Sequence, residues 1–156
     1  MPDPRSDRVF KRIFLNHPPA LIHLLNTFLP LPSPIEEVEY MPEELQSDLH
    51  GQYMSIVDVR CRDRLGRHFI VEMQLQKRKF LFRRLLYNAA RVYSRQLGIG
   101  ADVGALCPVY TPCLLDDSMF PGKEGWVHQV QPMSDGDGQG MGELYFTIVE
   151  MREWRE

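Results

Sequence analysis

Residues 55–74 read SIVDVRCRDRLGRHFIVEMQ, and this stretch decides the fold of the chain. It covers most of two β-rich runs, 53–61 and 67–75, and the residues RDRLG that join them. Gly66 in that joint can take the positive φ that short hairpin loops require. We therefore expect a β-hairpin that closes around residues 64–66.

The second run of this hairpin has two different faces. Counting by twos, residues 69, 71, 73 and 75 form an apolar face, whereas the face that begins at Ile70 carries Glu72 and Gln74. If Asp63 faces Arg67 across the turn, Asp58 lies directly opposite Glu72, with Cβ atoms about 4.5–5.5 Å apart. Two such carboxylates repel each other, and a basic partner, a shared proton or a divalent cation can offset this. The alternative is a solvated face that the two acids merely decorate.

Length and composition restrict the class of protein. A chain of 156 residues suits one domain, and 44% hydrophobic with 25% charged residues is ordinary for a globular protein. We expect a cytoplasmic protein without a membrane partner, because the sequence has neither an apolar run of about 18 residues nor a signal-peptide layout. The three cysteines are expected to be reduced. A zinc site from Cys107, Cys113, His50 and His68 lacks the short paired spacings that zinc ligands favour.

The remaining segments predict a mixed domain. Helices are expected at 7–14 and 20–29, separated by Pro18 and Pro19, and at 79–97. Strands are expected at 35–41, 105–116, 125–133 and 143–151, with a solvated loop at 42–52. This order indicates a mixed α/β or α+β sheet with helices packed on it.

Basic residues are concentrated in the segment from Lys77 to Arg95, although the net charge is −3. On the predicted helix, Arg84, Arg91 and Arg95 fall within about 40° of one another at 100° per residue. We expect this row to face solvent, opposite the apolar side of the helix. It is either a solubilising surface or a set of contacts to successive phosphates.

The hairpin motif resembles a known family. Asp58 is followed fourteen residues later by Glu72-Met73-Gln74, across a strand, a turn and a strand. This arrangement resembles the PD-(D/E)XK nucleases, in the subgroup of recombination-promoting nucleases and transposases. Segments 7–14, 55–74, 82–97, 108–116 and 144–151 look like that subgroup in the same order. Members usually continue well past the last of these segments, so residues 1–156 are expected to form a single, C-terminally short domain of this type.

The resemblance implies a restriction-endonuclease-like core, with a central mixed β-sheet flanked by helices. It also implies a catalytic set of Asp58, Glu72 and Gln74, with Mg²⁺, or Mn²⁺ as a substitute, bound by Asp58, Glu72 and the backbone carbonyl of Met73. Hard oxygen ligands suit Mg²⁺, which keeps several waters when bound. Gln74 stands where many members have lysine, and its amide can orient the attacking water.

Other residues are accessory candidates by the same resemblance. Asp7 is a candidate for the metal site, although it can equally be the N-cap of the first helix. Lys77 can supply a cation in place of the missing lysine, or simply precede the next helix. Glu150 matches a recurrent acid of the subgroup without an assigned role.

The expected function is that of a divalent-metal-dependent DNA endonuclease, linked to mobile-element or recombination activity. Arg84, Arg91 and Arg95 would contact the DNA phosphate backbone. The protein could also form a homodimer, which the sequence leaves open. The first alternative is a catalytically inactive, truncated remnant that binds nucleic acid or protein. The second is a zinc-stabilised interaction module, which a chelator would unfold.

Overall fold

A six-stranded mixed sheet forms the centre of the computed structural model, which describes residues 7–45, 55–140 and 142–152. The strand order is β1-β4-β5-β6-β8-β7, and the pairs β5–β6 and β6–β8 are parallel while the others are antiparallel. The strands are β1 (Val38–Tyr40), β4 (Val59–Asp63), β5 (His68–Gln74), β6 (Val109–Leu115), β7 (Val127–Val130) and β8 (Leu144–Glu150). A 3₁₀ turn, η1 (Val103–Ala105), precedes β6.

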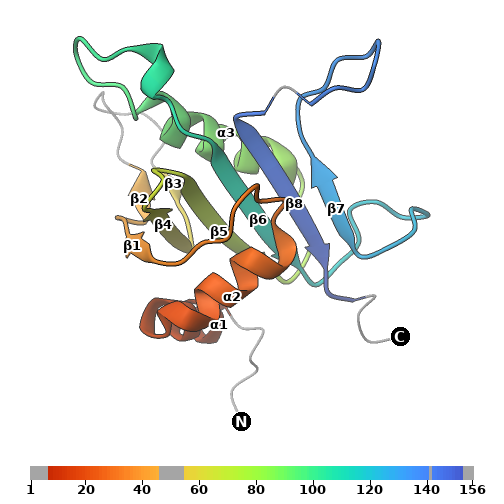
Figure 1. The fold of residues 1–156 in the computed structure, drawn as a ribbon. Helices are drawn as coiled ribbons and strands as arrows, with labels where there is room; N and C mark the ends of the chain where they lie inside the picture. Colours follow the sequence, from red (N-terminus) through yellow and green to blue (C-terminus); the bar gives the residue numbers. More distant parts are fainter. Residues whose placement is uncertain (1–6, 46–54, 141, 153–156) are drawn as a thin grey trace.

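Helices cover both faces of this sheet (Figure 1). The helices α1 (Asp7–Asn16) and α2 (Pro18–Phe28) lie on one face, and α3 (Leu81–Ser94) lies on the other. Pro18 and Pro19 form the first turn of α2, where a missing N–H removes no helical hydrogen bond. This α+β arrangement confirms the expected restriction-endonuclease-like fold class. Among the described helices, none is long and apolar enough to cross a membrane.

Alternation along β5 divides the core into two layers. Phe69, Val71 and Met73 pack with Leu21 and Leu25 of α2 on one side of the sheet. Ile70 packs instead against α3, in the cluster that contains Leu81 and Leu85. The face that carries Glu72 is therefore covered by α3 and is not an open surface.

The β4–β5 hairpin forms in the expected register. Val59 pairs with Val71 and Arg62 with His68. The carboxylate of Asp63 fixes the turn, because it accepts hydrogen bonds from the backbone N–H groups of Leu65 (3.1 Å) and Arg67 (3.0 Å). It also forms a buried ion pair with the Arg67 guanidinium, with 2.7 Å between Nε and Oδ2.

The first run of the hairpin bends, which the sequence did not predict. Residues Ser55–Ile56 form β3, which pairs with β2 (Glu44–Leu45) in a separate two-stranded sheet. Val57 continues this departure by donating its N–H to the carbonyl of Glu43 at 3.1 Å. The prediction of a loop throughout 42–52 was therefore wrong at residues 44–45, while 46–54 lie outside the described residues. Asp58 lies at the bend, between Val57 and the first residue of β4.

Candidate functional site

Asp58 replaces a strand partner at the end of the β4–β5 ladder. Its Oδ2 accepts a hydrogen bond from the backbone N–H of Met73 at 2.7 Å, two residues beyond the last ladder pair, Val59 and Val71. The observed pairs have residue numbers that sum to 130, which is the register from which Asp58 was expected opposite Glu72, but the ladder ends at Val59 and Val71, one residue short of that pair. The chain before Asp58 leaves the main sheet, so no backbone carbonyl of β4 accepts the N–H of Met73. The Asp58 carboxylate accepts this hydrogen bond instead.

The backbone of Met73 offers an oxygen at the same position. In an antiparallel ladder the N–H and C=O of one residue point toward the same neighbouring strand. Because the N–H of Met73 points to Asp58, its carbonyl points to that edge of β5 as well. The bend in the chain thus places a carboxylate and a backbone carbonyl next to each other.

Glu72 lies beside this edge and is almost completely buried, with 1% of its surface exposed. Arg84 of α3 extends to it, and its Nη2 is 3.3 Å from Oε2 of Glu72. A basic partner is therefore present to offset the charge of this carboxylate, as buried charges require. Arg84 was expected to face solvent, and the structure corrects this: its side chain is 33% exposed and directed at Glu72.

The negative charges of Asp58 and Glu72 both affect the pKa of a third residue, Cys113. Cys113 of β6 is the Cα partner of Glu72 in the parallel β5–β6 pairing. The pKa of the Cys113 thiol is raised to about 12, chiefly by burial; the negative charges of Glu72 and Asp58 act in the same direction, and Arg84 opposes them. Since both carboxylates act on one buried thiol, Asp58 and Glu72 lie in the same part of the sheet.

Gln74 ends β5 at the same location. It is half-buried, and its backbone carbonyl accepts a hydrogen bond from Asp116 at 2.9 Å. As the second residue after Glu72, it has its side chain on the α3 face of the sheet. The structure thus brings together Asp58, Glu72, Met73 and Gln74, the four residues of the predicted site.

The two accessory candidates have different positions. Asp7 is the first residue of α1, and its side chain lies outside the described part of the protein. Lys77 is exposed, and its backbone N–H donates to Asp117 at 2.9 Å. Asp117 also accepts the N–H of Ser118, and these two backbone hydrogen bonds lower the pKa of its carboxyl group. The segment between β5 and α3 is thereby fastened to the end of β6.

Glu150 has a structural role that the sequence did not reveal. Its side chain is fully buried, and Oε1 accepts hydrogen bonds from the backbone N–H groups of Met119 (2.8 Å) and Phe120 (2.9 Å). Ser118 Oγ donates to Oε2 at 3.3 Å. The carboxylate therefore holds the chain that follows β6, in the same region as Asp117.

The three predicted DNA-binding arginines do not form one exposed row. Arg84 contacts Glu72, whereas Arg91 donates to the hydroxyl group of Tyr87 at 2.9 Å and lies over its ring. Arg95 is exposed and lines a pocket near the β4–β5 turn. The buried face of α3 is centred on Leu85 and Val92, so the arginines lie along its border and not opposite it.

Sequence reasoning missed several residues of this region. Arg60, Arg62 and His68 line the same pocket as Arg95. Alternation in β4 and β5 was the signal that could have found them, because it places all three on the face that carries Glu72. Asn88 was also missed: it is 1% exposed on α3, and within the described residues neither atom of its side-chain amide has a hydrogen-bond partner.

The donor set at the bend fits a hard divalent cation. Two carboxylates and a backbone carbonyl are all oxygen ligands, and Mg²⁺ is typically held by one or two carboxylates while it keeps several waters. Within residues 7–45, 55–140 and 142–152, no group of three or more His, Cys, Asp or Glu side chains could hold a metal ion. A metal centre with two carboxylate side chains and one backbone carbonyl has fewer than three such side chains, so the absence of a larger group among the described residues does not argue against it.

Comparison with known proteins identifies the family of the chain. Neither the curated proteins nor the solved structures gave a match. A family model described as PD-(D/E)XK nuclease family transposase matches residues 4–156, which is almost the entire sequence. The chain therefore belongs to the PD-(D/E)XK nuclease family of transposases.

Proposed function

We propose that the protein is a divalent-metal-dependent endonuclease that hydrolyses phosphodiester bonds in DNA. Asp58, Glu72 and the backbone carbonyl of Met73 would hold Mg²⁺, or Mn²⁺ in its place. The observation that carries the proposal is the hydrogen bond from the backbone N–H of Met73 to Asp58. This bond fixes the Asp58 carboxylate next to the backbone carbonyl of Met73 and close to the buried Glu72. Membership of a family of nuclease-type transposases supports a nuclease function linked to transposition; the catalytic activity of this chain, its metal dependence and its DNA substrate are our proposal.

A bound hard cation supplies an activated water as nucleophile and neutralises charge that develops on the phosphate. The protein residues determine where this takes place. The hydrogen bond to Met73 holds the Asp58 carboxylate in one orientation. Glu72 is screened from bulk water by α3, which strengthens its electrostatic interactions. Both features provide a site that needs little rearrangement before it binds its ligand.

Gln74 and Arg84 complete the proposed centre. The amide of Gln74 can donate to and accept from a water molecule, so it can orient a nucleophile, but it cannot carry charge or remove a proton. The guanidinium of Arg84, within reach of Glu72, can donate to a phosphate oxygen that approaches the same carboxylate. We therefore propose positioning roles for both residues.

Cleavage of supercoiled plasmid tests this function. Wild-type protein with Mg²⁺ or Mn²⁺ should convert the plasmid to nicked or linear forms, and EDTA should prevent this. Asp58→Asn and Glu72→Gln should abolish cleavage, whereas Arg83→Gln, at an exposed position of α3, should retain it. Plasmid that is retarded on a gel but never cut would contradict the proposal and favour a nucleic-acid-binding remnant. Equal cleavage by wild type and Glu72→Gln would contradict the site.

A further inference from the structure

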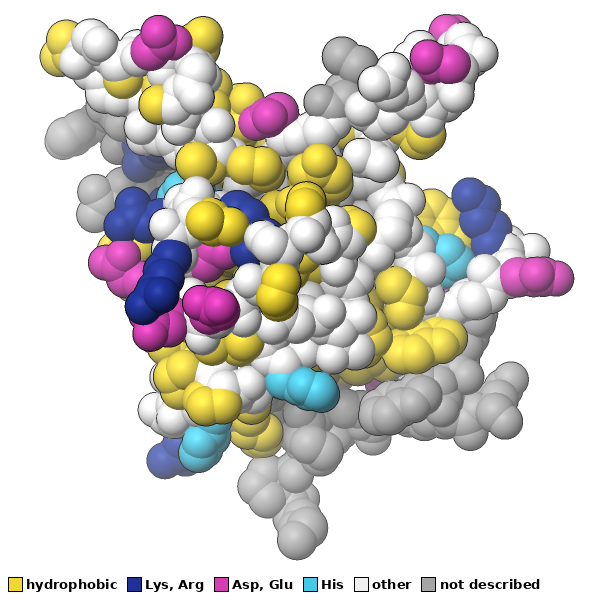
Figure 2. Space-filling model, in the orientation of Figure 1, with side chains coloured by type: hydrophobic (Ala, Val, Ile, Leu, Met, Phe, Trp, Pro, Cys, Tyr) yellow, Lys and Arg dark blue, Asp and Glu magenta, His cyan; other side chains and the backbone are white. Residues whose placement is uncertain are grey.

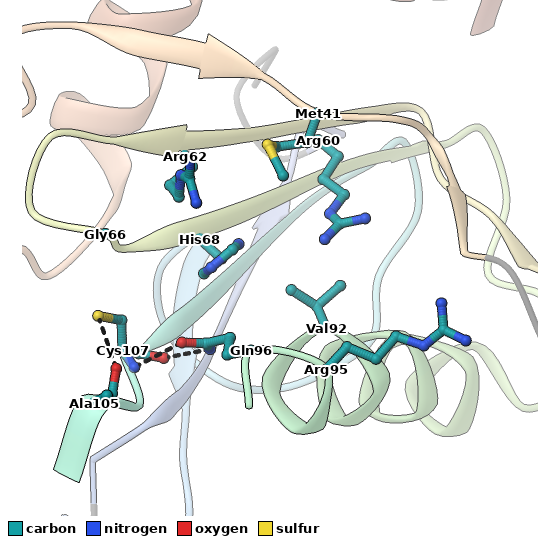
Figure 3. Close-up of a pocket in the computed structure, with 10 residues that line it drawn as sticks. All are labelled: Met41, Arg60, Arg62, Gly66, His68, Val92, Arg95, Gln96, Ala105 and Cys107. Carbon is teal, nitrogen blue, oxygen red and sulfur yellow. Dashed lines mark hydrogen bonds between the residues drawn. The ribbon is translucent and has the colours of Figure 1, made fainter. Parts of the chain in front are cut away.

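A second polar site lies on the same face of the sheet as Glu72. A pocket of about 330 Å³ opens between the β4–β5 hairpin and the C-terminal end of α3. Its polar lining consists of Arg60, Arg62, His68, Arg95 and Gln96 (Figure 3). The figure shows the side chains of Arg60 and His68 extending from the hairpin toward α3. Three arginines, from the hairpin and from the end of α3, thus line one pocket.

The described residues that line this pocket include three arginines. None of the described residues that line it is Asp or Glu. Arg62 forms an ion pair with Glu39 of β1, with 2.9 Å between Nη2 and Oε2, at the exposed edge of the sheet. Burial, followed by the positive charges of Arg95 and Arg62, lowers the pKa of Arg60. The arginines therefore repel one another, and a bound anion would relieve this repulsion.

His68 forms part of the pocket wall and lacks a partner at one ring nitrogen. Its side chain is only 7% exposed, and within the described residues its Nδ1 makes no hydrogen bond. A buried polar group without a partner is destabilising, so such groups are usually satisfied by another protein group, a ligand or water. Burial and the charges of Arg60 and Arg62 keep the imidazole neutral at pH 7. A neutral imidazole can donate one hydrogen bond to an anion.

The wall opposite the hairpin is fixed in place. Gln96 makes two hydrogen bonds to the backbone of Cys107, from Nε2 to the carbonyl (2.8 Å) and from the N–H to Oε1 (2.7 Å). Gly66 in the hairpin turn has φ +80°, and a Cβ there would lie 2.9 Å from Cys107 Sγ. The glycine therefore permits the close approach of the turn to this wall. Hydrogen bonds thus hold the backbone that forms this wall of the pocket.

Acidic surface lies nearby, but it is already paired. Arg64 lies 3.1 Å from Glu37 and 3.8 Å from Glu36, in the same edge region as the Arg62–Glu39 pair. Figure 2 shows Lys or Arg and acidic side chains side by side at this edge of the molecule. Exposed pairs of this kind contribute little and exchange partners readily. Arg62 can therefore turn from Glu39 to an anion in the pocket at small cost.

We propose that this pocket binds a phosphate group of the nucleic acid, separate from the phosphate that is cleaved. The identification of the carrier as nucleic acid rests on the proposed function, whereas the anion site itself does not. His68 and Glu72 are four residues apart on one strand and face the same way, which places them about 13 Å apart. A DNA strand advances about 3.4 Å per nucleotide along its axis, so the two phosphates would be a few nucleotides apart.

Two sources can supply this phosphate, a strand terminus or an internal phosphodiester, and the test separates them. The imidazole resonances of His68 are followed by ¹⁵N NMR in EDTA, first with inorganic phosphate and then with a short oligonucleotide that carries either a 5′-phosphate or a 5′-hydroxyl. We expect both phosphate and oligonucleotide to shift the His68 signals. A tenfold preference for the 5′-phosphate assigns the pocket to a terminus, and equal affinity assigns it to internal phosphates.

A matched pair of variants controls the experiment. Arg60→Gln combined with Arg95→Gln should weaken oligonucleotide binding at least tenfold, while Arg83→Gln on the same helix should weaken it by less than threefold. His68 signals that do not move with phosphate in the wild-type protein overturn the proposal, whether or not the double variant folds. Binding of inorganic phosphate without oligonucleotide binding overturns the nucleic-acid assignment. The pocket experiment is run in EDTA and does not depend on a metal, so a protein that binds oligonucleotide in the pocket but does not cleave plasmid with Mg²⁺ would contradict the nuclease proposal alone.

Discussion

The guanidinium of Arg84 lies 3.3 Å from the carboxylate of Glu72, and this pair joins α3 to the centre of the sheet. Glu72 is buried and Arg84 is about one-third exposed, so the arginine can move toward solvent while the acid cannot. A cation and the arginine would compete for the same negative charge. The pair therefore keeps the buried carboxylate compensated and leaves the site able to accept a metal.

Replacing Arg84 by Gln should lower the stability of the metal-free protein and increase its response to metal. Loss of the basic partner leaves the charge of Glu72 uncompensated, at a cost of about 1–2 kcal/mol because Arg84 is partly solvated. Thermal unfolding with EDTA and with Mg²⁺ measures both effects. Mg²⁺ should raise the Tm of the variant more than that of wild type. An equal Mg²⁺ response in wild type, Arg84→Gln and the control Arg83→Gln would contradict the competition.

Replacing Asp58 by Ala should destabilise the end of β5, whereas Asp58→Asn should not. Alanine leaves the N–H of Met73 without its acceptor, which costs about 1–2 kcal/mol, but the amide oxygen of asparagine can still accept that hydrogen bond. Urea unfolding gives the stability, and hydrogen exchange at Met73 reports the bond itself. Unchanged exchange at Met73 in the alanine variant would show that the bond is absent in solution.

Gln74→Lys should retain cleavage activity and Gln74→Leu should lose most of it. Lysine can still donate to a water or a phosphate, while leucine can neither donate nor accept. Initial rates of plasmid nicking with Mg²⁺ compare the two variants. A leucine variant as active as wild type would show that position 74 has only a packing role at the end of β5.

His68 should make the protein less stable in mild acid. Burial, together with Arg60 and Arg62, lowers the pKa of His68 to about 4 from its usual 6.5. Between these values the unfolded chain binds more protons than the folded one, so stability falls as the pH decreases from 6.5 to 4. The contribution is up to about 3 kcal/mol. Urea unfolding from pH 7 to 4.5 should show a shallower decline for His68→Gln than for wild type; parallel declines would contradict this.

Local chemistry made much of the hairpin predictable from sequence. The turn residues Asp63 and Gly66 fix the register of β4 and β5, and that register was correct from Val59 to His68. Alternation along β5 correctly separated the face of Phe69 from the face of Glu72, because a pleated strand directs successive side chains to opposite sides. The same alternation brought Glu72 and Gln74 to one site.

The remaining features depend on contacts between distant segments. The bend at Asp58 arises because Ser55–Ile56 pair with Glu44–Leu45, and nothing in the first hairpin run indicates this partner. The rotation of α3 was missed because Leu86 is 42% exposed although its side chain is apolar, which shifts the buried face toward Leu85 and Val92. Periodicity defines a helix face only broadly, so the contact between Arg84 and Glu72 required the tertiary structure.

Paramagnetic relaxation by Mn²⁺ tests the central claim most directly, because it locates the metal without relying on activity. We predict that Mn²⁺ at sub-stoichiometric levels broadens the backbone amide signals of Asp58, Met73 and Gln74, and that Glu72→Gln abolishes this selective effect. Excess Mg²⁺ should restore the signals. Broadening centred on the acidic segment of Glu36, Glu37 and Glu39, or unchanged in Glu72→Gln, would contradict a metal centre at the bend between β3 and β4.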